Sequence, residues 1–321
     1  MSIQKPFLKW VGGKTQIITD LLDNFPKEIN NYHEIFLGGC SVLLGLLSYI
    51  KNNKIKVEGK IYAYDINKGL IGVYKNIQSN HNELYDKVMF YRNEYDNCPS
   101  PPKDKKLINR KPQSLVDAKN NKESYYFWLR QKFNELTDRT TLDGSALFIV
   151  LNKLCFRGVY REGPNGFNVP YGNYKNTPQI FTKEELTNIN ILIKDVKFNV
   201  LDFEKSIKKI LNNEKKRKLE KKEKYKKDFI YLDPHYAPEN SKSFVGYNKD
   251  GFTLDNHKNL FTLIKNLSNI NKKIMMSNAK VELVTNNFEN ENYKIKNIEC
   301  RRAIHSKNPE SKTTEVIITN Y

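Results

Sequence analysis

Short apolar runs that end at polar or glycine-rich residues constrain the fold of this chain more than any other feature. Each run is short enough for a buried strand. The runs lie at residues 33–36, 61–65, 229–232, 274–277 and 315–319. Amphipathic stretches such as 42–50 and 256–267 predict helices between them. This alternation predicts an α/β fold with a largely parallel sheet flanked by helices.

The first two runs are each followed by residues suited to a nucleotide-like ligand, which open α/β sheets bind outside the strand carboxyl ends. Gly38 and Gly39 follow the first run and permit close backbone approach. Asp65 ends the second run, where an acidic residue can accept both ribose hydroxyls. Taken alone, a glycine pair also serves as a plain turn, and Asp65 as a helix cap.

The third run is followed at its carboxyl end by Asp233, Pro234, His235 and Tyr236. Adenine N6 is a poor nucleophile because its lone pair is delocalised into the ring. A carboxylate and a backbone carbonyl that each accept one N6 proton would localise that lone pair, and Asp233 and Pro234 supply both. Tyr236 offers a ring on which an extruded base stacks. Alone, an Asp-Pro turn after a strand is common.

The N-terminal segment 5–14 brings together an indole, a glycine pair and two lysines. Trp10 offers a face for adenosine, and Gly12 with Lys14 suits a carboxylate. As an isolated string, the segment is also compatible with a simple turn.

Composition favours a polyanionic partner, since the 321 residues carry a net charge of +18. An AT-rich genome, which enriches Lys and Asn, is the alternative explanation. Residues 214–227 hold part of this positive charge and are expected to form a solvated, partly helical insertion, with DNA-backbone contact as the minor alternative.

Four separated cysteines without a CxxC pair indicate a reducing compartment and no zinc site. No signal peptide or membrane span is expected.

Together, these segments resemble the Dam-type DNA adenine-N6 methyltransferases, the α-group of the D12 class. The family pattern runs K-W-x-G-G-K, F-x-G-G-x-S, an acidic second strand and D-P-P-Y. Here it stands at residues 9–14, 36–41, Asp65 and 233–236. The resemblance also covers 151–175, 198–204, 243–252, 273–279 and the C-terminal segment 313–321, which is nearly the whole chain apart from about 80–125 and 212–227.

The resemblance implies a Rossmann-like sheet that binds S-adenosylmethionine, with an inserted, mostly helical target-recognition domain. The catalytic part would comprise 1–75 and 190–321, and the inserted part 76–189. The implied activity is site-specific methylation of adenine N6 in double-stranded DNA, with no metal. The expected protein is an intracellular monomer or weak dimer without a membrane association. A separately acting cognate restriction endonuclease is left open.

The resemblance also assigns residues. Asp202 and Phe203 would border the cofactor adenine, Phe156 would wedge into the duplex, and Arg157 would hold the DNA backbone. Val159 and Arg161 would read base edges. The alternatives are core positions for Phe156 and Val159 and solvated surface for the arginines. The cofactor set is Trp10, Gly12, Lys14, Phe36, Gly38, Gly39, Ser41, Asp65, Asp202 and Phe203. The catalytic set is Asp233, Pro234, His235 and Tyr236, and the DNA set is Lys9, Phe156, Arg157, Val159 and Arg161.

His235 departs from the family pattern, which has a second proline there. The Pro234 carbonyl remains, but the loop loses a restraint on its backbone. A freer loop predicts slower methylation, whereas a proton-relay role for the imidazole predicts loss of rate at low pH. A non-catalytic, DNA-binding relic is the first alternative function. Methylation of RNA adenine or a protein glutamine is the second, and the inserted basic domain argues against it. Cys40 also replaces a commoner glycine, which would narrow the cofactor loop.

Overall fold

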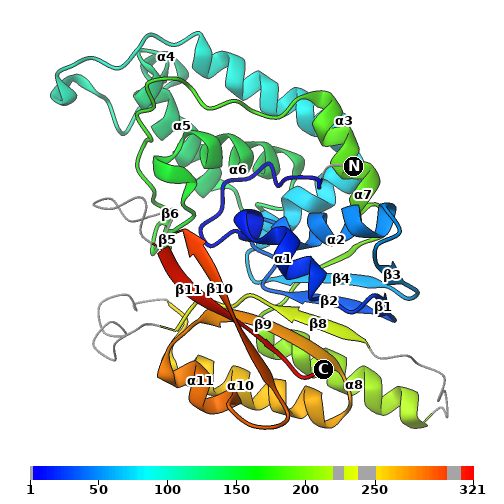
Figure 1. The fold of residues 1–321 in the computed structure, drawn as a ribbon. Helices are drawn as coiled ribbons and strands as arrows, with labels where there is room; N and C mark the ends of the chain where they lie inside the picture. The colour runs from blue at the N-terminus through cyan, green and yellow to red at the C-terminus, as the bar shows by residue number, and fades with distance from the viewer. Residues whose placement is uncertain (1–2, 220–227, 238–250, 302–311) are drawn as a thin grey trace.

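The computed structural model is organised around a seven-stranded sheet (Figure 1). It describes residues 3–219, 228–237, 251–301 and 312–321, without the side chains of 216–219, 300–301 and 312–313. The strand order is β10-β11-β9-β8-β2-β4-β7. In that order the strands span Lys294–Arg301, Lys312–Thr319, Lys273–Ala279, Phe229–Leu232, Tyr32–Ile35, Ile61–Asp65 and Lys197–Val200.

The sheet is largely parallel, as the sequence predicts. β2 pairs in parallel with both β4 and β8, β4 with β7, and β8 with β9. β11 runs antiparallel to both β9 and β10. All five expected runs form strands, although β2 ends at Ile35 and leaves Phe36 in the following turn. Two strands, β7 and β10, were not expected.

Helices cover both faces of the sheet and enclose two apolar cores (Figure 1). On one face lie α1 (Ile18–Asp23), α2 (Ser41–Lys51) and the first part of α3 (Lys68–Asp96). On the other lie α8 (Phe203–Leu219), α10 (Leu254–Asn269) and α11 (Glu282–Phe288). The helices expected at 42–50 and 256–267 are confirmed as α2 and α10.

A second, mostly helical part stands above the sheet in Figure 1. α3 runs from the end of β4 into this part, so residue 75 falls inside a helix. The main core continues from the sheet into these helices without a break. Besides the end of α3, the second part contains α4 (Leu115–Ala118), α5 (Lys122–Glu135), α6 (Leu142–Leu154) and α7 (Lys183–Ile193). It also contains the short helices η2 (Lys105–Leu107) and η3 (Phe156–Gly158), and the hairpin of β5 (Glu162–Gly163) and β6 (Gly166–Phe167).

Two segments singled out by the sequence lie largely outside the described residues. The basic stretch 214–227 is described only as far as the backbone end of α8 at Leu219. The stretch 243–252 is described only from residue 251. Within the described ranges, no helix has both the length and the apolar character needed to cross a bilayer.

The order of the strands reverses direction at the boundary between β2 and β8. From β2 the chain adds β4 and β7 on one side, and then returns to place β8 and β9 on the other. Open α/β sheets bind ligands in the crevice at such a switch point. The residues after β2 and β8 therefore define where a site is expected. A separate two-stranded pairing, β1 (Glu28–Ile29) with β3 (Lys56–Val57), lies outside this sheet.

Candidate active site

The turn between β2 and α2 has an unusual backbone. Phe36, Gly38 and Cys40 have φ values of 70°, 51° and 66°. Positive φ is strained for residues other than glycine and is often found at ligand sites. The Cys40 side chain is fully buried in the main core, so it does not narrow the turn toward solvent. The turn is thus shaped by backbone conformation at the switch point.

Asp65 ties the neighbouring strand end to this turn. Its carboxylate accepts the Gly38 N–H at 2.9 Å and the Asn67 N–H at 2.9 Å. Burial raises the pKa of Asp65, and these two hydrogen bonds partly oppose that rise. The cap of α3 is Asn67, which accepts the Leu70 N–H, so the capping alternative for Asp65 is wrong. Beside it, Ile66 is 71% exposed and offers an apolar face that the sequence analysis missed.

Lys14 joins the N-terminal segment to the turn after β8. It opens the short helix η1 (Lys14–Gln16), and its side chain is buried although Gly12 and Gly13 are exposed. Its Nζ lies 2.9 Å from Oδ1 of Asp233 and donates to the Gly12 carbonyl at 2.8 Å. Its backbone N–H donates to Ser41 Oγ. The ammonium group therefore lies against the Asp233 carboxylate and is anchored to the start of α2.

Burial dominates the electrostatics of Asp233. It raises the pKa of the carboxyl above its ordinary value, while the Lys14 ammonium lowers it and Glu315 raises it further. An ammonium group at contact distance favours the ionised carboxylate. Asp233 is thereby held as a hydrogen-bond acceptor in a largely desolvated place.

Tyr236 is held by a residue that the sequence analysis missed. Its hydroxyl donates to Glu315 Oε2 at 2.6 Å, and Lys14 Nζ lies 4.8 Å from the centre of its ring. Burial, together with the nearby carboxylates, raises the pKa of Tyr236, which keeps the hydroxyl protonated as a donor. Glu315 lies on β11, in the C-terminal segment that the family resemblance covers, but the sequence assigns it no role. Its position next to the end of β9, opposite Ala279, brings it here.

The backbone after Tyr236 is also fixed. The Ala237 N–H donates to Oδ1 of Asn278, a fully buried residue of β9. Pro234 is buried between Asp233 and His235. Strand β9 thus supports the turn from one side, while Lys14 holds it from the other.

Comparison with known proteins identifies the family of the chain. Residues 10–304 match the family described as D12 class N6 adenine-specific DNA methyltransferase. The chain belongs to this methyltransferase family. It is 33% identical to the Type II methyltransferase M.MjaIII of Methanocaldococcus jannaschii over 99% of both chains. It is 27% identical to the DNA adenine methylase of Haemophilus influenzae, over 96% of this chain and 90% of that relative.

A further relative is the Type II methyltransferase M1.LlaDCHI of Lactococcus lactis subsp. cremoris. It is 26% identical over 99% of this chain and 95% of its own length. These full-length similarities confirm the family resemblance and the methyltransferase fold expected from the motifs.

Within this methyltransferase, Trp10 lies between the turn after β2 and the aromatic side chains of Phe148 and Tyr160. Its ring stacks on Tyr160 and Phe148, with centroid distances of 5.9 and 6.4 Å. A Cβ atom on Gly38 or Gly39 would approach Trp10 atoms to 3.0 or 2.7 Å. Both glycines therefore allow the indole to lie close against the turn. The sequence predicts an adenosine contact for Trp10 but does not indicate these packing contacts.

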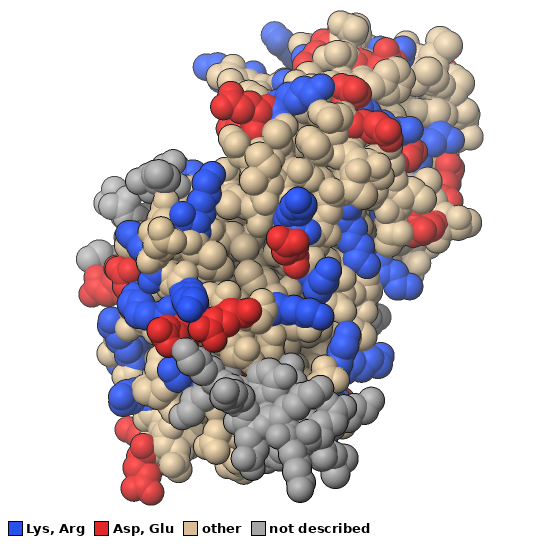
Figure 2. Space-filling view, turned by 90° about the vertical axis from the view of Figure 1, so that its right-hand side faces the viewer, with Lys and Arg blue, Asp and Glu red and all other residues tan. Residues whose placement is uncertain are grey.

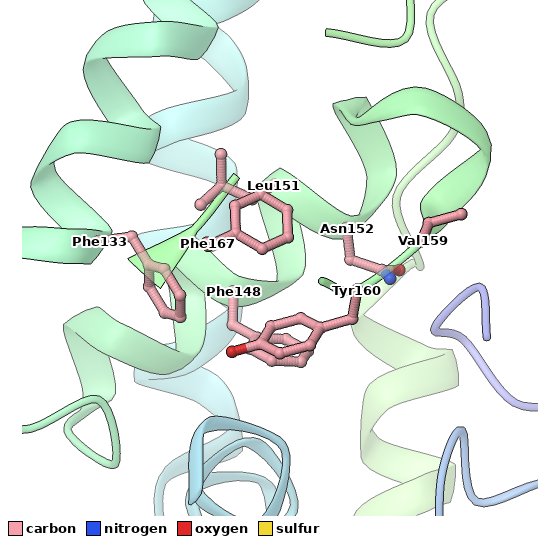
Figure 3. A pocket seen from close by; sticks show the side chains of 7 residues that line it. All are labelled: Phe133, Phe148, Leu151, Asn152, Val159, Tyr160 and Phe167. Carbon is pink, nitrogen blue, oxygen red and sulfur yellow. The ribbon is translucent and has the colours of Figure 1, made fainter. Parts of the chain in front are cut away.

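The side chain of Asn152 connects the N-terminal segment at Lys9 with Gly158 by hydrogen bonds. Its side-chain oxygen accepts the Lys9 N–H at 3.0 Å, and its Nδ2 donates to the carbonyls of Lys9 at 2.8 Å and Gly158 at 3.2 Å. Figure 3 shows Asn152 beside Val159 and the stacked rings of Tyr160 and Phe148, in a pocket lined by aromatic side chains. Segments some 140 residues apart in sequence are thereby joined beside the methyltransferase site.

The expected DNA-binding side chains are mostly exposed. Phe156 is 47% exposed, so it is not a core residue, and the Arg157 guanidinium lies over its ring at 5.2 Å. Arg161 is also exposed, and its Nε donates to Asn168 Oδ1. Val159 is half-buried and packs against the main core. The exposed Lys9 places its Nζ 4.7 Å from the Tyr174 ring centre.

Asp202 and Phe203 lie together at the start of α8. The Asp202 carboxylate accepts the Lys205 N–H and pairs with the Lys205 ammonium, so this residue caps the helix. Phe203 stacks on Phe36, in the turn after β2, with ring centroids 5.8 Å apart. On the face shown in Figure 2, basic side chains are spread over both parts of the molecule and alternate with acidic ones. The net positive charge is not gathered into one patch on that face.

Proposed function

We propose that this protein is a site-specific, adenine-specific DNA methyltransferase that transfers a methyl group from S-adenosylmethionine to N6 of an adenine flipped out of duplex DNA. The observation that carries this proposal is the juxtaposition of Asp233, Lys14 and Tyr236 beside the glycine turn and Asp65. A DNA substrate implies action inside the cell. We propose a monomer or weak dimer, with any cognate restriction endonuclease acting separately.

The residues present fit an adenosyl group. Asp65 presents a carboxylate for ribose hydroxyls, and the half-buried rings of Phe36 and Phe203 with the exposed Ile66 offer apolar faces for the base. Gly38, Gly39, Ser41 and the Gly12 region would accept the rest of the cofactor by backbone approach. When bound, S-adenosylmethionine supplies an activated methyl group on a sulfonium. The protein's main task is then alignment.

The target amine would be held by the turn after β8. The Asp233 carboxylate would accept a hydrogen bond from one N6–H and the Pro234 carbonyl a hydrogen bond from the other, and the proton that N6 loses after methylation would pass to water. These two acceptors draw the nitrogen toward tetrahedral geometry and localise its lone pair. Lys14 keeps Asp233 ionised for this role, and Tyr236 would stack on the extruded base. His235 belongs to the same turn, and its contacts are described below.

We propose that residues 76–189 recognise DNA and that 1–75 with 190–321 form the catalytic part. Exposure of Phe156 supports a wedge that enters the duplex, and exposure of Arg157 supports a backbone contact. Arg161 would read a guanine edge, with Val159 beside it. Lys9 would add a backbone contact.

Labelled cofactor tests the proposal. The protein is incubated with tritiated S-adenosylmethionine and either duplex DNA, RNA or a protein extract. Label in DNA alone supports the proposed function. Label in RNA or protein would replace it, and cofactor binding without transfer would identify the inactive relic.

A further inference from the structure

The side chains of the catalytic turn face two different surroundings. Asp233 and Tyr236 contact Lys14 and Glu315. The His235 ring instead stacks on Phe252, with centroids 5.8 Å apart and planes inclined by 19°. His235 thus joins a different set of contacts from the two residues proposed to hold the target adenine.

Phe252 connects His235 to the cofactor side of the site. It packs against Phe36 at 5.8 Å and against Phe203 at 5.3 Å. Phe36 belongs to the strained turn after β2, and Phe203 opens α8. All three phenylalanines are half-buried, and His235, although packed on Phe252, keeps part of its surface exposed. The four rings form an aromatic cluster with accessible surface at the carboxyl ends of the strands.

Asp65 is the acidic group that acts on His235. Burial lowers the pKa of the imidazole below its ordinary value of 6.5, and Asp65 partly opposes this shift. His257 lies behind Phe252, and burial lowers its pKa to about 4. Asp202 precedes Phe203 and has a lowered pKa, so it remains ionised. At neutral pH the His235 ring is therefore uncharged, stacked on Phe252 with Asp65 as its acidic neighbour.

We propose that His235 is a cofactor-contacting residue whose neutral imidazole extends the aromatic wall of the adenosyl site beside Asp65. The proposal rests on the proposed function. A protonated imidazole would compete with ribose hydroxyls for the Asp65 carboxylate and would repel the positively charged sulfonium. The neutral ring is therefore the form that binds. Compared with the family's second proline, His235 leaves the loop less rigid but adds a contact to the cofactor.

Calorimetric titration without DNA tests this inference. S-adenosylmethionine is titrated into the full-length wild type, His235→Pro and His235→Phe from about pH 5.5 to about pH 8.5. His81→Asn is the matched control, because His81 lies on α3 outside the cluster. S-adenosylhomocysteine, which lacks the sulfonium charge, is titrated in parallel.

We expect His235→Pro to raise the Kd for S-adenosylmethionine by about fivefold at neutral pH, the loss expected for one contact. The wild-type affinity should fall as the pH drops below 6.5, more steeply for S-adenosylmethionine than for S-adenosylhomocysteine. His235→Phe should lose this pH step, and His81→Asn should keep it.

An unchanged Kd in His235→Pro, with slower single-turnover methylation at saturating cofactor, would overturn the inference and place His235 on the target side. A pH step that persists in His235→Phe would assign it to Asp65 and also contradict the inference. A wild type that binds cofactor but modifies no DNA would contradict the proposed function alone.

Discussion

The Nζ atom of Lys14 lies 2.9 Å from Oδ1 of Asp233, and both side chains are largely withdrawn from solvent, with 4% and 19% exposure. The pair joins the N-terminal segment to the turn after β8, across the switch point of the sheet. Removal of one partner leaves the other charge buried without a counter-ion, which is costly. Loss of this ion pair should therefore change both the free energy of unfolding and the rate of methylation.

Asp233→Ala should abolish methylation while cofactor affinity stays within a few-fold, because Asp233 acts on the target amine. The variant should also unfold more easily, by about 3–5 kcal/mol, since Lys14 loses its buried partner. Rate assays, cofactor titration and urea unfolding check the three quantities. Asp233→Asn serves as the control of similar shape, and near-normal turnover in either variant would remove Asp233 from catalysis.

Tyr236→Phe and Glu315→Gln should each slow single-turnover methylation by about tenfold, because a hydrogen bond to a charged group contributes about 1.5–3 kcal/mol. If Glu315 acts only through the Tyr236 hydroxyl, the double variant should be no slower than the single ones. Fluorescence of 2-aminopurine at the target position reports base stacking in each variant. Losses that multiply would show that Glu315 acts independently of Tyr236.

Arg161→Ala should relax sequence preference at a cost of roughly 1–3 kcal/mol on the cognate duplex, if it makes a bidentate base contact. Arg157→Ala should instead weaken binding to every duplex and flatten the salt dependence. Competition binding with cognate and scrambled duplexes at several salt concentrations separates the two roles. Equal losses on both duplexes for Arg161→Ala would exclude base readout.

The buried carboxyl group of Glu34 should make the free energy of unfolding depend on pH. It is buried beneath the cofactor turn, accepts the Tyr32 hydroxyl at 2.7 Å, and has a pKa raised by burial from 4.5 to about 8. The folded state therefore keeps a proton that the unfolded state releases, and stability falls as the pH rises from 4.5 to about 8. Glu34→Gln should remove this slope of up to about 1.4 kcal/mol per pH unit. Urea unfolding across this range checks it, and parallel curves for both proteins would contradict the assignment.

Asn152→Ala should destabilise the fold by about 2–4 kcal/mol, since three backbone groups lose their partner. It should also weaken binding to cognate DNA, because residues 76–189, which we propose recognise DNA, lose a link to the N-terminal segment. Asn287→Ala is the control, since its Nδ2 donates to the Leu283 carbonyl within α11 and its Oδ1 accepts from Lys265 Nζ of α10, so neither bond involves the N-terminal segment. Equal effects of the two substitutions would deny Asn152 this role.

The sequence predicts the sheet well because its signals are local. Apolar runs and the residues that end them lie next to each other in the chain, and parallel pairing then gathers Gly38, Asp65 and Asp233 at one edge. The edge strand β10 was missed because Lys294, Lys296 and Glu299 interrupt its apolar pattern.

Contacts between distant segments were not predictable in the same way. Glu315 lies in a segment that the resemblance covers, but only the antiparallel register of β11 with β9 brings it to Tyr236. Lys14 was expected to meet a cofactor carboxylate, but its ion pair with Asp233 depends on how η1 packs beside β8. The packing of Trp10 against Gly38 likewise follows from tertiary structure.

The central claim is the transfer of a methyl group to adenine N6 in DNA. The most direct measurement is digestion of duplex DNA to nucleosides after incubation with labelled S-adenosylmethionine, followed by separation of the methylated products. The account predicts label in N6-methyldeoxyadenosine with the wild type and none with Asp233→Ala. Label in another nucleoside, or equal label with both proteins, would contradict it.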